Sequence, residues 1–102
     1  MADLIQIQTT TGSEAEADRI ASFLLQKKLV ACVQVFGPIR SRYVWNGVQE
    51  ESTEWMCNIK TLAARYAAVE AAIREVHTYD EPEIIAVAVS QASKGYADWV
   101  SR

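Results

Sequence analysis

The sequence contains little cysteine, proline or glycine: two, two and four residues respectively among 102. The two cysteines, Cys32 and Cys57, show neither a CxxC motif nor a zinc-knuckle spacing, so we expect reduced thiols and no zinc finger. With so few prolines and glycines, no stretch reads as a linker or a low-complexity segment. Residues 1–3 lack the basic flank and apolar run of a signal peptide, and we therefore expect a cytoplasmic protein.

Basic charge is also scarce. Ten Lys and Arg against thirteen Asp and Glu leave a net charge of -3 and a pI near 5.1. Such a chain repels nucleic-acid backbones and anionic membrane surfaces alike, so we expect neither as a partner. No apolar run reaches the length of a membrane span. There is no Gly-rich phosphate loop, no GxSxG elbow and no HExxH motif, so we do not expect an enzyme.

Strand-favouring residues surround Asn46-Gly47, the strongest short-range signal for a β-hairpin. They run from about residue 30 to about residue 61, so each arm has about 14 residues and extends about 45 Å. With a two-residue turn, the expected cross-strand pairs are Trp45 with Val48, Tyr43 with Glu50, and Arg42 with Glu51.

The far half of this hairpin needs a cover that the chain itself does not supply. Flanking helices of about 15 residues reach only about 22 Å and shelter about half of each arm. Large apolar side chains nevertheless lie beyond that point: Ile39, Tyr43, Val44, Trp45, Val48 and Trp55. Such groups imply a partner surface. In the alternative interpretation, Gly37-Pro38 breaks the arms and the tip is a mobile flap.

The segment before the hairpin predicts one strand and one helix. Residues 3–10 alternate between apolar and polar side chains, as a half-buried strand does. Residues 14–28 follow with the apolar stripe of an amphipathic helix. Ser13 and Glu16 have the spacing of a capping box, in which the carboxylate reaches back to the start of the helix.

The segment after the hairpin predicts a helix, a strand and a second helix. Thr61 is a candidate N-cap for a helix over residues 62–76. The nearly continuous apolar run 84–89 is typical of a strand buried on both faces, which would be central or covered. Ser93 is a candidate cap for a short helix over 94–100, which would cover an otherwise open end.

This βαββαβ order predicts an α+β, ferredoxin-like sandwich with a long central β-hairpin and a short C-terminal helix. We expect one domain spanning residues 1–102, with both crossover helices on one face of the sheet. The other face carries Val, Ile and aromatic residues without a helix, so the sheet should pack against copies of itself. A closed ring satisfies every copy alike, and a trimer is one natural closure.

Several segments combine motifs that are specific when taken together. They are Leu29-Val30-Ala31-Cys32-Val33, Tyr43-Val44-Trp45-Asn46-Gly47, Glu54 with Lys60-Thr61, His77-Thr78-Tyr79-Asp80-Glu81-Pro82-Glu83-Ile84-Ile85, and Tyr96-Ala97-Asp98-Trp99-Val100. In this order, and spanning nearly the whole chain, they resemble the CutA family of divalent-cation tolerance proteins.

The resemblance implies a cytoplasmic homotrimer, similar in architecture to PII signalling proteins, with sheets facing the threefold axis and hairpins crossing to neighbours. It also implies a link to tolerance of copper and other divalent metals, and a sensor or regulator role. This chain has Thr78 where many relatives have proline or serine, and Thr9-Thr10 where some carry a cysteine. The second departure weakens any soft-metal site that would use that thiol.

His77, the only histidine, belongs to the one cluster with mixed ligand types, because Asp80, Glu81 and Glu83 follow it. Imidazole with thiolate or carboxylate suits Cu(II) or Zn(II). We therefore predict His77 and Cys32 as metal ligands, completed by a carboxylate from a neighbouring subunit, with no obligatory cofactor. The alternatives are a His77 that only stabilises a helix end and a Cys32 that is a small buried apolar residue.

The predicted ligand-binding residues are Tyr43, Trp45, Lys60, Tyr79, Asp80 and Glu83. As a binding and signalling module, the protein would hold a metal ion or small molecule in clefts between subunits. There, loop residues of one chain would meet hairpin residues of another, such as Arg40, Arg42 and Lys60. The alternatives are an ion pair between Lys60 and Glu54, aromatic side chains that only pack, and a scaffolding trimer that binds no metal.

Overall fold

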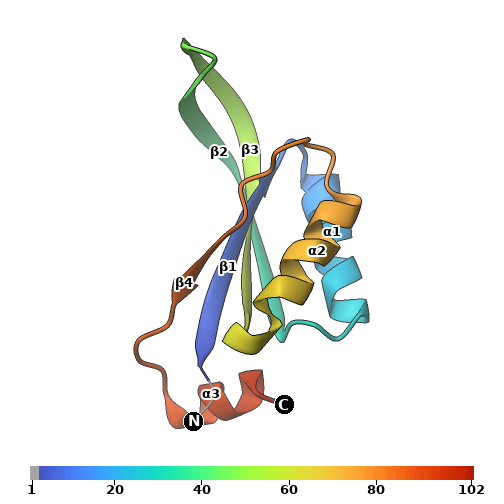
Figure 1. Ribbon diagram of the computed structural model, residues 1–102, viewed down its shortest axis with the longest axis vertical. Helices are drawn as coiled ribbons and strands as arrows, with labels where there is room; N and C mark the ends of the chain where they lie inside the picture. Colours follow the sequence, from blue (N-terminus) through green and yellow to red (C-terminus); the bar gives the residue numbers. More distant parts are fainter. Residues whose placement is uncertain (1–2) are drawn as a thin grey trace.

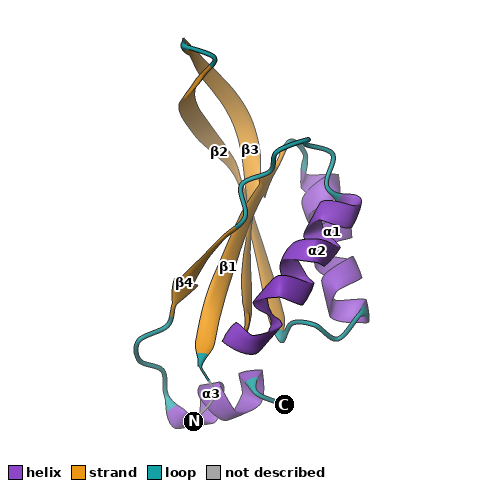
Figure 2. Ribbon diagram, in the orientation of Figure 1, coloured by secondary structure: helices purple, strands orange, loops and turns teal. Residues whose placement is uncertain are grey.

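The computed structural model describes residues 3–102 and has the predicted α+β, ferredoxin-like architecture. The elements in chain order are β1 (Leu4–Thr11), α1 (Glu14–Gln26), β2 (Cys32–Trp45), β3 (Val48–Leu62), α2 (Tyr66–Val76), β4 (Ile85–Ala88) and α3 (Lys94–Val100). The four strands form one antiparallel sheet, which carries α1 and α2 on one face and α3 at one end (Figure 1 and Figure 2).

The strand order of the sheet is β2-β3-β1-β4. β1 pairs with β3 along its whole length, from Leu4 opposite Leu62 to Thr11 opposite Trp55. The prediction that residues 84–89 form a central or covered strand is wrong for the chain by itself. They contain the short edge strand β4, all of whose residues are exposed. An apolar run indicates a strand, but it does not say which surface covers that strand.

β2 and β3 form the predicted hairpin with the predicted register. The expected pairs are present: Trp45 with Val48, Tyr43 with Glu50, and Arg42 with Glu51. The turn residues Asn46 and Gly47 have positive φ angles of 52° and 77°, the left-handed conformation that a type I′ turn requires. The turn chemistry thus sets the register of both long strands.

Gly37 and Pro38 produce a bulge in β2 rather than a break. The register shifts between Phe36 and Ile39, and pairing resumes beyond it. A Cβ atom at Gly37 would lie 2.5 Å from the ring of Trp55, so the bulge needs glycine where that ring crosses it. Because the ladder continues to the tip, the flap interpretation is wrong.

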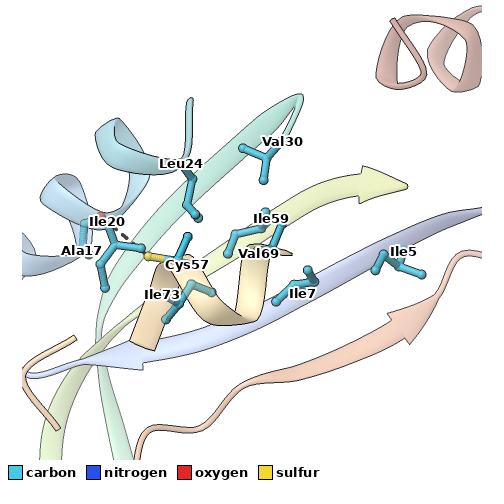
Figure 3. Packing of buried hydrophobic residues seen from close by; sticks show 11 residues of the cluster. Ile5, Ile7, Ala17, Ile20, Leu24, Val30, Cys57, Ile59, Val69 and Ile73 are labelled. Carbon is cyan, nitrogen blue, oxygen red and sulfur yellow. Dashed lines mark hydrogen bonds between the residues drawn. The ribbon is translucent and has the colours of Figure 1, made fainter. Parts of the chain in front are cut away.

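The core lies between the sheet and its two covering helices (Figure 3). Ile7 and Ile59 occupy paired positions on β1 and β3. They meet Ile20 and Leu24 of α1 and Ile73 of α2, and all five side chains are fully buried. The apolar stripe predicted for the first helix therefore covers the sheet through Ile20 and Leu24, and α2 covers it through Ile73.

The predicted N-caps of the first two helices, Ser13 and Thr61, have different outcomes. Ser13 caps α1 as predicted, since its Oγ accepts a hydrogen bond from the backbone N–H of Glu16 at 3.1 Å. Thr61 does not cap α2: it lies in β3 and its hydroxyl donates to the carbonyl of Leu29 at 2.8 Å. A 3-10 turn over residues 63–65 follows, and α2 begins at Tyr66. The prediction that Thr61 caps a helix is wrong because its hydroxyl is hydrogen-bonded to the carbonyl of Leu29, which is distant in the sequence.

The short helix α3 closes one end of the molecule, as predicted. Its cap is Ser93, whose Oγ accepts from the backbone N–H of Tyr96 at 3.4 Å. Ala97 and Val100 pack against Leu4 in a small second cluster. Tyr96 itself is exposed, so only one side of the helix contributes to this cover.

The sheet face opposite the helices is more polar than predicted. Gln6 lies opposite Lys60, and Gln8 lies opposite Asn58, to which its Nε2 donates at 3.2 Å. The large exposed apolar side chains of this face lie on the edge strands: Phe36, Ile85 and Val87. On the central strand β3, Met56 lies opposite Phe36 and is half-buried. The face therefore carries the predicted Val, Ile and aromatic residues, and they lie at its edges.

The distal half of the hairpin projects beyond α1 and α2 (Figure 1). The longest axis of the molecule measures 44 Å. Near the tip, Val44, Trp45 and Val48 are 70%, 57% and 59% exposed. The chain therefore does not cover its own hairpin tip, as predicted, and the surface that covers it stays a prediction.

Candidate functional site

An open cleft of about 730 Å³ lies between the distal hairpin and the loop of residues 77–84, which joins α2 to β4 and is called the cleft loop below. Its lining residues are Thr10, Tyr43, Trp45, Glu50, Glu54, Thr78, Tyr79, Asp80, Glu81 and Glu83. They supply three aromatic side chains, five carboxylates and, within the described chain, no lysine or arginine. We call this the acidic cleft.

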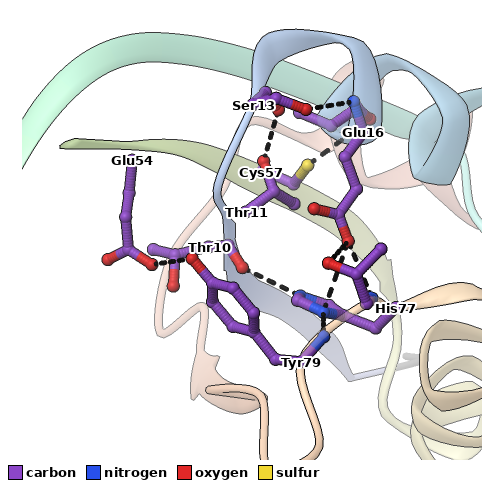
Figure 4. Close-up of polar contacts among 10 residues, drawn as sticks. Thr10, Thr11, Ser13, Glu16, Glu54, Cys57, His77 and Tyr79 are labelled. Carbon is purple, nitrogen blue, oxygen red and sulfur yellow. Dashed lines mark hydrogen bonds and ion pairs between the residues drawn. The ribbon is translucent and has the colours of Figure 1, made fainter. Parts of the chain in front are cut away.

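His77 anchors the beginning of the cleft loop to β1 (Figure 4). Its side chain is fully buried, and Nε2 lies 2.8 Å from the carbonyl oxygen of Thr10. The backbone N–H of Tyr79 donates to His77 Nδ1 at 3.0 Å. These two bonds place the ring proton on Nε2, which donates to the carbonyl. Both ring nitrogens are therefore used by backbone groups.

Glu16, on the first turn of α1, anchors the next residue of the loop. Its Oε2 accepts bonds from the backbone N–H and the hydroxyl of Thr78, both at 2.9 Å, and lies 3.5 Å from His77 Nδ1. Burial by itself raises the pKa of Glu16, but the two Thr78 bonds, with a bond from the backbone of Gly12, hold the pKa below its usual value. The predicted capping box is therefore only half formed, because this carboxylate faces the cleft loop.

Tyr79 forms a wall of the cleft and is held from two sides. Its hydroxyl donates to Glu54 Oε2 at 2.9 Å (Figure 4). A Cβ atom at Gly12 would come within 3.3 Å of this hydroxyl, so the chain leaves little room there for a larger residue. Burial, and then the bond to Glu54, raise the pKa of Tyr79 to about 12. The phenol therefore keeps its proton and acts as a donor.

Glu54 is the most buried carboxylate of the acidic cleft. It is 8% exposed, although it lies beside the exposed part of the hairpin. Within residues 3–102 it forms no ion pair, and its Oε1 has no hydrogen-bond partner. Glu81 differs, because it contacts Arg74 Nη2 at 3.4 Å. The charge of Glu54 thus has a hydrogen-bond donor but no cation.

Most of the predicted ligand-binding residues line this one cleft: Tyr43, Trp45, Tyr79, Asp80 and Glu83. Lys60 does not. It lies on the open face of the sheet opposite Cys32, where its ammonium group donates to Gln34 Oε1. Because the predicted site takes Lys60 from a neighbouring subunit, its place in that site stays a prediction. The alternative ion pair between Lys60 and Glu54 is not formed within residues 3–102.

A single chain does not bring His77 and Cys32 together. Cys32 pairs with Lys60, which pairs with Gln6 of β1. His77 contacts Thr10, four residues further along β1, or about 13 Å at about 3.3 Å per residue. The predicted metal site of these two residues is not assembled in the chain and would need a second copy.

Four residues of the site were not predicted from the sequence to belong to it: Thr10, Glu16, Glu50 and Thr78. For Glu16, the only sequence signal was the capping box, which assigned its carboxylate to another partner. For Glu50, the hairpin register was sufficient, because it places Glu50 opposite Tyr43 near the tip. Nothing in the sequence joined Glu16 to Thr78, which lie 62 positions apart.

The fold and the site together define a class: a ferredoxin-like protein with an overhanging hairpin and an acidic, aromatic-walled cleft at its base. Comparison with known proteins then identifies the family. A family model described as CutA1 divalent ion tolerance protein matches residues 5–102, and the chain belongs to this family.

Relatives of this chain share most of its length. It is 39% identical over 94 residues to the divalent-cation tolerance protein CutA of Archaeoglobus fulgidus, covering 92% of this chain and 91% of that protein. The Pectobacterium atrosepticum protein of the same description is 32% identical over 101 residues, covering 99% of this chain and 92% of its own. The human protein CutA is longer, since the match covers only 51% of it.

Solved structures agree with the fold. The divalent ion tolerance protein CutA1 from Ehrlichia chaffeensis superposes with a TM-score of 0.92 at 33% identity, covering 98% of this chain and 94% of that one. The Archaeoglobus fulgidus structure, described as a periplasmic divalent cation tolerance protein, gives 0.92 at 38% identity, covering 95% and 94%. Among the helices in residues 3–102, none is both long and apolar enough to cross a membrane.

Proposed function

We propose that this protein acts in divalent-cation tolerance by binding a cation in the acidic cleft. One observation carries the proposal: the described cleft has five carboxylates and no basic residue in its walls. Such a surface concentrates cations and repels anions. The description of the family, divalent ion tolerance, supports the same class of ligand.

In this proposal the protein is a binding module rather than an enzyme. His77 is the residue that acid-base catalysis would most readily use, but backbone groups occupy both of its ring nitrogens. Burial, with Asp18 and Glu16 nearby, raises the pKa of the Cys57 thiol to about 11, so that it is a poor nucleophile. The cleft thus offers charge and shape rather than a reactive group.

The donors of the cleft suit a hard cation better than Cu(II). Carboxylate oxygens are the ligands that Mg²⁺, Ca²⁺ and Mn²⁺ prefer, whereas Cu(II) binds imidazole well. Within residues 3–102, no three His, Cys, Asp or Glu side chains form a group that could hold a metal. A copper site would require His77 to break its present hydrogen bonds, or it would require a second copy of the chain to supply Cys32.

We further propose a cytoplasmic homotrimer built by sheet packing and hairpin exchange. The exposed apolar tip of the hairpin and the exposed edge strand β4 are surfaces that such an exchange would cover. The acidic cleft would then border a neighbouring subunit, whose hairpin carries Arg40 and Arg42. Two free cysteines support the cytoplasm as the location, in contrast to the description of the Archaeoglobus fulgidus structure.

A second function is favoured by the aromatic walls. The cleft is lined by three aromatic residues, Tyr43, Trp45 and Tyr79. Binding a bare metal ion does not require three such surfaces, whereas an organic ligand packs against them. A signalling or scaffolding trimer that binds a small metabolite or a partner protein, and no metal, is the function that these walls favour.

Calorimetric titration of the assembled protein with Cu(II) and Mn(II) tests the proposal. We expect binding that weakens at least about tenfold when Asp80→Asn and Glu83→Gln are combined, because charged ligand contacts are lost. The matched control combines Glu14→Gln and Asp18→Asn, which remove the same charge from exposed positions of α1. Cation binding that is equal in both double variants contradicts the proposal.

His77→Ala addresses the copper site separately. If Cu(II) binding disappears while sedimentation still shows the trimer, His77 is a ligand in the assembled particle. If Cu(II) binding is unchanged, His77 only anchors the cleft loop, as its contacts in the chain indicate.

A further inference from the structure

The turn at the far end of the hairpin consists of Asn46 and Gly47 (Figure 1). Both residues are exposed, and both have positive φ angles, 52° and 77°. A Cβ atom added at Gly47 would have no neighbour within 4 Å, and the Gly47 N–H pairs with no backbone acceptor within residues 3–102. The Gly47 nitrogen is therefore free of packing and of the strand ladder.

An asparagine side chain reacts with the backbone nitrogen that follows it when that nitrogen is unhindered. The Gly47 nitrogen gives its proton to water and attacks Cγ of Asn46, and the new N–Cγ bond closes a succinimide ring. The Cγ–Nδ2 bond breaks, and Nδ2 takes up a proton and leaves as ammonia. Water then opens the ring at either carbonyl and yields aspartate or isoaspartate. The net change is hydrolysis of one amide, without oxidation or reduction.

The other asparagine of the chain, Asn58, lies where the fold opposes the same reaction. It is in β3, paired with Gln34 on one side and Gln8 on the other, and its Oδ1 accepts from Gln8 Nε2 at 3.2 Å. The residue after it is Ile59, which is β-branched and fully buried. The backbone there does not rotate without breaking the sheet. The chain therefore contains its own comparison site.

The two products have different effects on the turn. An Asp-Gly pair suits a type I′ turn as an Asn-Gly pair does, so the aspartyl product leaves the register intact. The isoaspartyl product instead routes the backbone through the former side chain and adds a methylene group before Gly47. The two-residue turn between the paired Trp45 and Val48 has no spare length for this additional backbone atom. The isoaspartyl product should therefore open the ladder at the tip.

We infer that Asn46 is a site of spontaneous deamidation, and that its isoaspartyl product loosens the tip of the hairpin. Apart from water, the reaction is intramolecular, so it needs neither a ligand nor an enzyme. The inference goes beyond the proposed function, because a cation in the acidic cleft neither supplies nor removes an atom of this reaction.

Mass spectrometry of the assembled protein, incubated at mildly alkaline pH, tests the deamidation. Trypsin cleaves after Arg42 and Lys60, so one peptide, residues 43–60, contains both asparagines. We expect conversion at Asn46 to be at least about tenfold faster than at Asn58, because glycine follows the first and isoleucine the second. Equal rates, or no conversion at Asn46, would overturn the inference. The assembled protein is the required sample, because a neighbouring subunit that immobilises the turn would stop the reaction.

Hydrogen exchange tests the loosening of the tip. Fresh Asn46→Asp supplies the aspartyl product directly, and Asn46→Gly keeps a turn-forming pair that does not deamidate. We expect incubated wild-type protein to develop a fast-exchanging population over residues 43–49, in proportion to the isoaspartate that electron-transfer fragmentation detects. Fresh Asn46→Asp and incubated Asn46→Gly should show no such population. If either of them exchanges as fast as incubated wild-type protein, or if the isoaspartyl fraction exchanges like fresh protein, isoaspartate does not loosen the tip.

Discussion

The two long strands pass through two different environments. In the proximal half, Ile59 of β3 is fully buried between the sheet and the helices. In the distal half, Val44 and Val48 of the same two strands are 70% and 59% exposed. The backbone ladder is continuous through both halves apart from one bulge. Backbone pairing therefore shapes the distal hairpin, whereas apolar burial stabilises only the proximal half within the chain.

The largest effect should come from the proximal half. Ile59→Ala removes a fully buried side chain at the centre of the core, and we expect it to lower the free energy of unfolding by about 4 kcal/mol. Chemical denaturation of the assembled protein measures this. Leu25→Ala, on an exposed position of α1, should cost less than about 1 kcal/mol. Equal costs for the two would remove the contrast between core and surface.

In the distal half, the side chain should act on assembly instead. Trp45→Ala removes a large anchor and should weaken subunit association by about 3 kcal/mol per site if the ring is desolvated in the assembly. Sedimentation velocity across a dilution series gives the association constant. Trp99→Ala, at the 44% exposed Trp99 of α3, is the control. Unchanged sedimentation and melting temperature for Trp45→Ala would show that the tip has no partner.

The cleft loop lies between the two halves and should show an intermediate effect. Glu16→Ala deprives Thr78 of the acceptor for two bonds of 2.9 Å, and we expect a loss of about 2 kcal/mol in the free energy of unfolding. Hydrogen exchange should also show faster exchange at the Thr78 amide. Glu14→Ala, at an exposed position two residues before Glu16, should leave that amide protected. If both variants behave alike, the loop has another anchor.

The same carboxylate predicts an acid-dependent loss of stability. Because the pKa of Glu16 is lowered in the folded state, its stabilising contribution is present above the usual value of 4.5 and is lost as the pH falls below it. Denaturation measured from about pH 6 to about pH 3 should show a steeper loss for the wild-type protein than for Glu16→Gln. Parallel curves would mean that Glu16 has the same pKa in the folded and unfolded chain.

The smallest effect should come from the surface pair of the distal hairpin. Arg42 Nε lies 3.5 Å from Glu51 Oε1, with side chains 61% and 53% exposed. A double-mutant cycle with alanine should give a coupling energy below about 0.5 kcal/mol, because solvent screens such pairs. A coupling several times larger would mean that assembly buries this pair and that the distal half is less exposed than in one chain.

Prediction from sequence succeeded where the relevant contacts are local. The Asn46-Gly47 turn sets the register of β2 and β3, and Ser13 caps the helix that directly follows it. Prediction failed where a side chain had two partners to choose between. Thr61 and Glu16 are both residue types found in helix caps, yet each forms its hydrogen bond with a residue far away in the chain. Thr61 donates to the carbonyl of Leu29, and Glu16 accepts from Thr78. Sequence spacing describes the nearer partner and contains no information on the farther one.

By itself, the sequence determined the order of strands and helices, the hairpin register and half of the residues that line the cleft, because periodicity and turn chemistry act over a few residues. Only the tertiary structure decided that β4 is an edge strand, that Lys60 lies apart from the cleft of its own chain, and that Glu54 is buried against the hydroxyl of Tyr79. These outcomes depend on how strands distant in the sequence pack together, and that packing sets both burial and the distances between charges.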